Sequence, residues 1–228
     1  MEDKTEDKRI VVAIDGPAGA GKSTVARAVA ERIGVPYLDT GALYRAIALK
    51  LHEEHIMPDD GERVSERLKD LRLEVGRGTI SADGVDVTAE IRSALVDGIV
   101  SAYAARPEVR DALTGLQRAQ AARGLVADGR DMGTVVFPDA ELKIFLTADA
   151  EERARRRYKE RLERGEEADY DDILKQVKER DRYDMTREIA PLRPAQGCII
   201  IDSSDMSAEE AADAVASLAV EFERQRKR

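Results

Sequence analysis

The chain has 228 residues, 43% of them hydrophobic, which is enough to bury the core of one large domain or of one domain with an insert. Its formal net charge of −9 argues against DNA or RNA as a partner, because binding to such polymers depends on neutralising many phosphates. One cysteine and two histidines exclude an internal disulfide and a tetrahedral zinc set. No apolar run approaches the ~18 residues that span a bilayer, and the charged residues 1–9 do not resemble an export signal. We therefore expect a soluble cytoplasmic protein with no membrane partner.

The basic residues are 27 arginines and only 10 lysines. Guanidinium groups bind phosphate with two parallel hydrogen bonds, so a small phosphorylated ligand is one explanation. A GC-rich genome that favours arginine codons explains the bias equally well. The absence of asparagine is more decisive, because it excludes the Asn-Lys-x-Asp guanine motif of GTPases and the catalytic-loop asparagine of protein kinases.

The first predicted elements are a strand, a turn and a helix. Residues 10–14 form a continuous apolar run typical of a buried parallel strand, and a glycine-rich turn follows. Apolar residues at helical spacing predict a helix over 22–32, which Gly34 and Pro36 end. Tyr37 and Leu38 form a second short strand candidate, and Thr40 is the expected N-cap of a helix over 42–52.

The stretch 62–90 has a different pattern. A short helix is followed by alternating runs at 71–75, 78–82 and 85–87, and Asp83-Gly84 between two of them predicts a hairpin. Helices are predicted over 91–104 and 108–122, the second opened by Pro107. Further strands are expected at 125–127, 142–146 and 198–201, and helices over 150–164, 171–187 and 207–226. This alternation predicts an α/β fold with a central parallel sheet flanked by helices and a small antiparallel insert.

One motif directly predicts chemistry. The sequence Gly16-Pro17-Ala18-Gly19-Ala20-Gly21-Lys22-Ser23 fits the phosphate-binding pattern G-x-x-x-x-G-K-[ST] (the P-loop) at every fixed position. It follows a predicted strand and opens a predicted helix, so its backbone N–H groups can surround the phosphates of ATP or GTP. Lys22 would pair with those phosphates, and the Ser23 hydroxyl would bind Mg²⁺. A chance glycine-rich turn is the alternative.

Other features narrow the class of P-loop protein. The switch motif Asp-x-x-Gly of GTPases is absent, and small-molecule kinases are the commonest P-loop proteins of this length. Three polar clusters, at 39–45, 127–134 and 179–187, follow; the first two come directly after predicted strands, where α/β proteins bind ligands. The first cluster is also compatible with an ordinary capped helix. The third, with Arg180, Asp184 and Arg187, is also compatible with a solvated salt-bridged helix face.

Together these stretches resemble the bacterial cytidylate kinase (CMP kinase) family. The matching segments cover about residues 10–202, and the run Asp-Gly-Arg-Asp-Met-Gly-Thr at 128–134 is the most specific of them. The resemblance implies a P-loop nucleoside-monophosphate kinase fold in a single domain. Its core would comprise about 10–61, 91–150 and 188–228, with an insert in the NMP-binding region at about 62–90 and a mobile lid at about 153–170.

The resemblance also implies roles for individual residues. Lys22, Arg130 and Arg187 would be catalytic, and Thr24 and Arg157 would join the P-loop in binding ATP. Arg45, Arg130 and Arg187 would bind the acceptor phosphate, Arg180 and Asp184 the sugar hydroxyls, and Ser101, Arg110 and Asp131 the cytosine, with Thr40 and Tyr44 lining the same pocket. Arg153, Arg155, Arg156 and Arg157 are candidate phosphate clamps near the lid.

We therefore expect a Mg²⁺-dependent, monomeric enzyme that transfers a phosphoryl group from ATP to CMP and dCMP. A related kinase with another acceptor, such as UMP, AMP or shikimate, is the nearest alternative. A nucleotide-binding regulatory module without phosphotransfer is the alternative from a different class.

Overall fold

The computed structural model describes residues 9–76 and 78–226. The chain forms two compact units, which we call the P-loop unit (Met1–Leu38 and Gln120–Arg228) and the insert unit (Asp39–Ala119). Residues 1–8, on which the expectation about an export signal partly depends, lie outside the described residues. No helix in the described part of the chain has the length and apolar character needed to cross a membrane.

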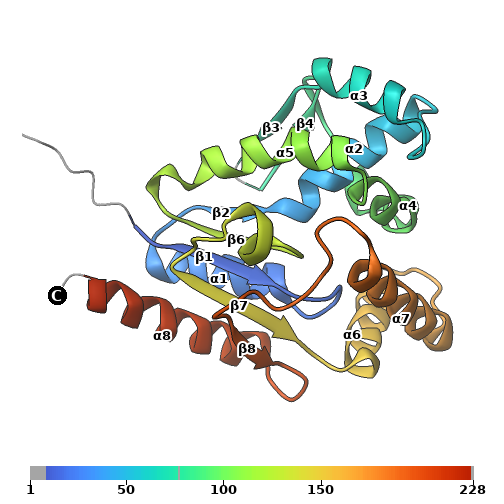
Figure 1. Cartoon of the computed structure of the whole chain (residues 1–228). Coiled ribbons are helices and arrows are strands. Elements are labelled where there is room, and N and C mark those ends of the chain that lie inside the picture. The colour runs from blue at the N-terminus through green and yellow to red at the C-terminus, as the bar shows by residue number, and fades with distance from the viewer. Residues whose placement is uncertain (1–8, 77, 227–228) are drawn as a thin grey trace, which may run out of the picture. The chain divides into compact units, whose positions relative to one another are not determined.

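A five-stranded sheet forms the centre of the P-loop unit, in the order β2-β6-β1-β7-β8 (Figure 1). Parallel pairing joins β1 to β6 and β7, and β7 to β8. The strands are β1 (Val11–Asp15), β2 (Tyr37–Asp39), β6 (Leu125–Gly129), β7 (Leu142–Thr147) and β8 (Ile199–Asp202). Every residue of β1 and β6 is buried, which explains why these strands are continuously apolar up to their last residues.

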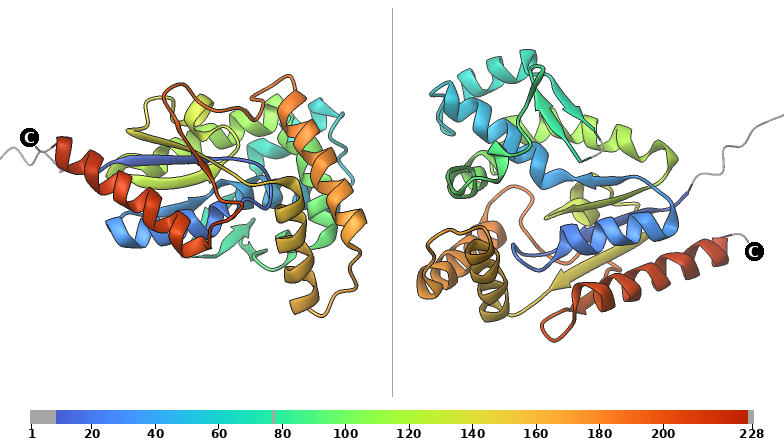
Figure 2. Two further views of the ribbon diagram at one scale, coloured as in Figure 1. Left: turned by 90° about the horizontal axis from the view of Figure 1, so that it is seen from below. Right: turned by 180° about the vertical axis from the view of Figure 1, so that it is seen from behind.

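Helices α1 (Lys22–Ile33) and α8 (Ala208–Arg226) lie side by side, as both views of Figure 2 show. Their buried side chains, Val25, Val29 and Val215 among them, join Val12 and Ile14 of β1 in the main core. Helices α6 (Ala150–Glu163) and α7 (Tyr170–Thr186) pack on each other at the end of the sheet toward which β7 runs. Shorter helical turns lie at Gln120–Arg123 (η2) and Met132–Val136 (η3, a π-helical turn).

The insert unit contains α2 (Thr40–Glu53), α3 (Gly61–Asp70), α4 (Ala94–Ala104), α5 (Pro107–Ala119) and the short turn η1 (Glu90–Arg92). Its sheet is antiparallel and consists of β3 (Leu73–Val75), β4 (Ile80–Ala82) and β5 (Val85–Asp86). Asp83 and Gly84 connect β4 to β5 with φ angles of 53° and 78°, so the two-residue hairpin turn is confirmed. The predicted α/β class, with a parallel sheet and a small antiparallel sheet, is confirmed as well.

Several predicted boundaries are wrong. Asp39, not Thr40, is the N-cap of α2: its Oδ1 accepts the Ala42 N–H at 2.9 Å, so the helix begins at Thr40. The helix predicted from residue 91 begins at Ala94, because Ser93 caps it and η1 precedes it. Helix α5 ends at Ala119 and gives way to η2. Strand β6 runs two residues beyond its predicted end, because Asp128 and Gly129 still pair with Ile14 and Asp15.

Candidate active site

The P-loop connects β1 to α1. At Gly16 an added Cβ would lie 1.9 Å from the Leu146 carbonyl oxygen, so only glycine fits there. Gly21 precedes α1 with a φ of 84°, and no side chain caps the helix N-terminus. The first turn of α1 carries no acidic residue, and Gly19, Ser23 and Thr24 are exposed. This arrangement leaves the helix N-terminus available to an anion.

Lys22 is buried, and its ammonium group donates to the Pro17 carbonyl at 2.7 Å. Burial and the nearby charge of Arg130 lower the pKa of Lys22 well below its usual range. Arg180 acts in the same direction, whereas Asp128 and Asp15 oppose it. Phosphate oxygens beside Lys22 would stabilise its charged form, so the site is electrostatically complementary to a polyanion.

Asp128 lies at the end of β6, next to the P-loop. Its carboxylate accepts hydrogen bonds from the Ser23 hydroxyl at 2.9 Å and from the Tyr37 hydroxyl at 3.0 Å. A hydroxyl and a carboxylate at this position are oxygen ligands of the kind that Mg²⁺ prefers when it also binds nucleotide phosphates. In the sequence, the P-loop motif predicts only Ser23 as a metal ligand. An acidic residue at the carboxyl end of a buried strand beside a P-loop is the signal that would have indicated Asp128.

Asp15, the last residue of β1, holds the turn η3. Its two carboxylate oxygens accept the backbone N–H groups of Met132 at 2.7 Å and Gly133 at 2.8 Å. Burial raises the pKa of Asp15 to about 6, although these two hydrogen bonds act to lower it. Turn η3 follows directly after Arg130 and Asp131, so Asp15 positions two predicted substrate-binding residues.

Four of those predicted residues form one cluster in the P-loop unit, which we call the arginine–aspartate cluster: Arg130, Asp131, Asp184 and Arg187. Arg130 Nε donates to Asp184 Oδ2 at 3.0 Å, and Arg187 lies 4.0 Å from both Asp184 and Asp131. Asp131 and Asp184 are only 2% and 3% exposed. Arg180 lies on α7 with Asp184, and its charge is among those that lower the pKa of Lys22. The two arginines of this cluster, which are predicted to bind the acceptor phosphate, are therefore held by carboxylates.

The insert unit carries the other predicted substrate residues. Thr40, Tyr44 and Arg45 lie on α2, Ser101 on α4 and Arg110 on α5. Arg110 is buried and lies 5.4 Å over the ring of Tyr44, a cation–π geometry. Arg45 donates to the Ile91 carbonyl and forms an ion pair with Asp97. Asp97 was not predicted, because nothing in its local sequence distinguishes it from other acidic residues on a helix.

The four candidate clamps on α6 differ. Arg153 is buried among protein acceptors, Arg155 is exposed and pairs with Glu152, and Arg156 donates to the Ser203 carbonyl and to Glu152. Arg157 lies one turn after Arg153, on the same side of the helix. The clamp role of Arg157 stays a prediction.

Comparisons with known proteins identify the family of this chain. The family model described as "Cytidylate kinase" matches residues 12–221. A cytidylate kinase of Caldicellulosiruptor saccharolyticus is 47% identical over 216 residues, covering 92% of this chain and 96% of that protein. One of Carboxydothermus hydrogenoformans is 48% identical over 204 residues, covering 87% and 92%.

A solved structure shows a similar fold. An uncharacterized protein from Eubacterium ventriosum superposes with a TM-score of 0.52 at 15% identity, covering 92% of this chain and 98% of that one. At this identity the likeness concerns the fold alone. The family model and the relatives span nearly the whole chain, including the P-loop and the arginine–aspartate cluster. The chain therefore belongs to the cytidylate kinase family.

Proposed function

We propose that this chain transfers the γ-phosphoryl group of ATP directly to CMP and dCMP, giving CDP and dCDP. Membership of the cytidylate kinase family supports the reaction. The observation that carries the proposal is the P-loop lysine surrounded by arginine charge: Arg130 and Arg180 both affect the pKa of Lys22, and Arg130 joins the arginine–aspartate cluster. Two polyanions can be brought together only where several cations converge.

The proposed mechanism depends on positioning and charge rather than on covalent or acid–base chemistry. The P-loop N–H groups and Lys22 hold the donor phosphates. Arg130 and Arg187 hold the acceptor phosphate, together with Arg45 of the insert unit. The carboxylates of Asp184 and Asp97 keep these guanidinium groups oriented before the substrate arrives, so less entropy is lost when the phosphate binds.

We propose that Ser23 and Asp128 hold Mg²⁺ when the donor nucleotide is bound. The metal would neutralise charge on the donor phosphates during transfer. Both oxygen groups already lie 2.9 Å apart, so little rearrangement is required. The proposal is tested by Ser23→Ala and Asp128→Asn, each of which should raise the Mg²⁺ concentration needed for half-maximal activity while the affinity for CMP stays unchanged.

The remaining roles are also proposals. Ser101, Arg110 and Asp131 would recognise cytosine, and Arg180 and Asp184 the sugar hydroxyls. Residues 153–170 would act as a lid, for which Gly165, exposed and with a φ of 73°, offers a flexible point between α6 and α7. The enzyme would act in the cytoplasm. It would be a monomer, which sedimentation of the purified chain at several concentrations tests.

The central experiment is a coupled assay of ADP release from Mg-ATP with a panel of acceptors: CMP, dCMP, UMP, AMP and shikimate. We expect the highest kcat/KM with CMP and dCMP. A higher value with another acceptor would reassign the substrate. ATP binding without acceptor-dependent ADP release would instead support a regulatory nucleotide-binding module.

A further inference from the structure

Arg153 of α6 lies between the P-loop and α7. The residue is 4% exposed. Its Nε donates to the Ala148 carbonyl at 2.8 Å, and its Nη1 donates to the Ala18 carbonyl at 3.0 Å. The same guanidinium forms a two-point ion pair with Asp181 of α7, at 3.0 and 2.5 Å. These four hydrogen bonds involve all three nitrogens, so the side chain is held by the protein rather than directed at a ligand.

The bond to Ala18 affects the shape of the P-loop. In a trans peptide the C=O and the following N–H point in opposite directions. Because the Ala18 carbonyl is directed at Arg153, the Gly19 N–H points away from α6. Arg153 also packs closely on the loop here, since an added Cβ on Gly19 would lie 3.2 Å from the Arg153 Cβ. Arg153 therefore controls the direction of a backbone donor in the phosphate-binding loop.

The bond to Asp181 connects the P-loop to α7. Arg180 is the neighbouring residue, Asp184 lies one turn later, and Arg187 is the C-cap of α7. Arg180 and Asp184 are the residues assigned to the sugar hydroxyls, and Arg187 is assigned to the acceptor phosphate. Asp181 is mostly buried, with 15% of its side chain exposed. Removing its charge would leave the guanidinium buried and unpaired, so the pair is expected to act as a unit.

We propose that the Arg153–Asp181 pair is a positioning element of the donor site, which orients the Ala18–Gly19 peptide for phosphate binding and couples it to α7. The inference rests on the proposed function, because it takes the P-loop to be the donor site. It differs from the clamp role considered for the arginines of α6, in which Arg153 would touch phosphate directly.

Calorimetric titration with a non-hydrolysable ATP analogue and Mg²⁺ distinguishes these two roles. Asp181→Asn replaces one of the two carboxylate oxygens by an amide NH₂ group, which cannot accept a hydrogen bond. The Arg153 guanidinium therefore loses one of its two bonds to this residue and shifts. We expect Asp181→Asn and Arg153→Lys each to weaken analogue binding at least about tenfold. The double variant should bind the analogue no more weakly than the weaker-binding single variant, because both changes disrupt the same ion pair. In steady-state assays the KM for ATP should rise more than the KM for CMP.

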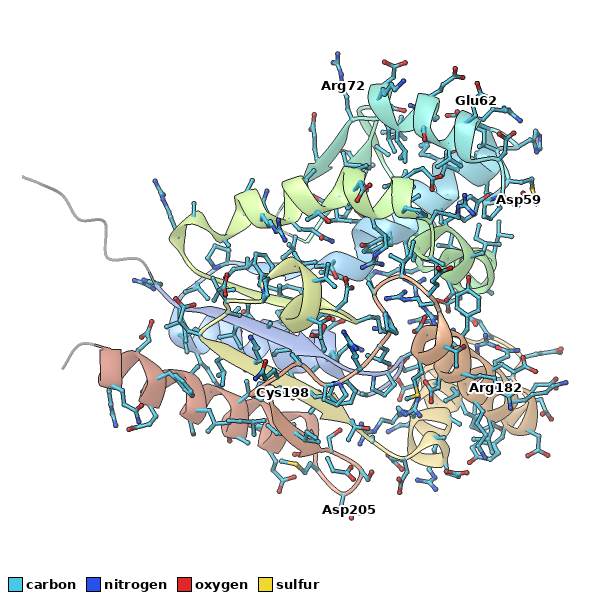
Figure 3. All side chains as sticks on the ribbon, in the orientation of Figure 1. Asp59, Glu62, Arg72, Arg182, Cys198 and Asp205 are labelled. Carbon is cyan, nitrogen blue, oxygen red and sulfur yellow. The ribbon has the colours of Figure 1, made fainter. Side chains whose placement is uncertain are left out.

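The controls are Arg182→Lys and Asp172→Asn, which make the same chemical changes at exposed positions of α7. Arg182 is labelled in Figure 3. Both should bind the analogue as the wild type does. If Asp181→Asn binds the analogue as well as the wild type or more tightly, while Arg153→Lys binds it more weakly, Arg153 is a direct clamp and the proposal is wrong. Wild-type binding by both variants would also overturn it.

Two further measurements keep the test decisive. Should Asp181→Asn fail to fold, Asp181→Glu retains the buried charge but displaces it by one methylene, and the same tenfold criterion applies. Acceptor-dependent ADP release by the wild type is measured separately. Its absence would contradict the proposed function, whereas the titration would still test the link between Arg153 and the P-loop.

Discussion

The P-loop and the arginine–aspartate cluster belong to the same unit, and both are assigned to phosphate, but they are built differently. The P-loop consists of eight consecutive residues, Gly16–Ser23, and presents mainly backbone N–H groups. The cluster consists of side chains that directly follow β6 and of side chains at the C-terminal end of α7. Arg130 and Asp184 are 54 positions apart. Phosphate binding by backbone groups depends on the conformation of the glycines. Phosphate binding by side chains depends on the length of each side chain and on the arrangement of its hydrogen-bonding atoms.

This difference predicts how each region responds to mutation. Most side chains of the P-loop can change without removing a backbone N–H donor. Lys22 therefore accounts for most of what the P-loop side chains contribute to phosphate binding. In the cluster even a conservative change removes a hydrogen bond and leaves a buried carboxylate without its partner. The following predictions test this contrast, from the largest expected effect to the smallest.

Lys22→Ala should lower kcat by several orders of magnitude, because a charge that stabilises the transferred phosphoryl group is worth several kcal/mol. The fold should survive, since removing the ammonium group frees only the Pro17 carbonyl. Steady-state ADP release and circular dichroism measure the two effects. Near-normal activity of a folded variant would contradict the P-loop assignment.

Arg130→Lys should lower kcat/KM for CMP about ten- to hundredfold, because lysine keeps the charge but not the fork that also binds Asp184. Arg45→Lys should act in the same direction through the loss of its bonds to Ile91 and Asp97. ATP affinity should change little in either variant. Separate titrations of each variant with CMP and with an ATP analogue measure the two affinities. Weaker ATP binding with intact CMP binding would contradict the acceptor assignment.

Asp131→Asn should narrow the preference for CMP over UMP by at least about tenfold in kcat/KM. Cytosine offers its N4 amino group to a carboxylate, whereas uracil presents an oxygen there that an asparagine amide can meet. A mismatch of this kind in a buried pocket costs roughly 1–3 kcal/mol. Kinetics with both substrates decide the question, and an unchanged ratio would show that Asp131 does not recognise the base.

Asp15→Asn should have the smallest effect on turnover, because asparagine keeps one acceptor for η3. Its main effect concerns the pH dependence of stability. The pKa of Asp15 is raised from 3.8 to about 6, so between these values the folded state binds more protons than the unfolded state. The contribution of Asp15 to the free energy of unfolding therefore falls as pH rises from about 4 to about 6, by as much as about 3 kcal/mol.

Urea denaturation at several pH values measures this contribution as the difference between the wild type and Asp15→Asn. As pH rises from about 4 to about 6, the free energy of unfolding of the wild type should fall relative to that of Asp15→Asn. Carboxyl groups whose pKa is lowered, such as Asp83, have the opposite dependence, but they are common to both proteins and cancel. A difference that stays constant with pH would show that Asp15 titrates normally.

Local patterns in the sequence predicted much of this protein. The P-loop, the alternation of strands and helices and the Asp83-Gly84 hairpin all depend on residues that are neighbours in the chain, so their signals are complete in a short window. The family resemblance added the substrate-binding residues, and the structure brings four of them together as the arginine–aspartate cluster. The small boundary errors at Thr40 and Ile91 arose because the capping side chains are Asp39, one residue before Thr40, and Ser93, two residues after Ile91.

Only the tertiary structure decided which residues hold the functional groups in place. Asp15 holds η3 across 117 and 118 positions, Asp128 holds Ser23 across 105, and Arg153 reaches Ala18 across 135. In the sequence Asp15 and Arg153 are ordinary charged residues, because their partners are backbone groups that leave no local pattern. Asp128 has a signal in its place at the carboxyl end of a buried strand, but its partner Ser23 is not visible there. The sequence by itself thus determined which groups can do the chemistry. The fold decided which buried charges hold them in place, because only packing brings distant segments within hydrogen-bonding distance.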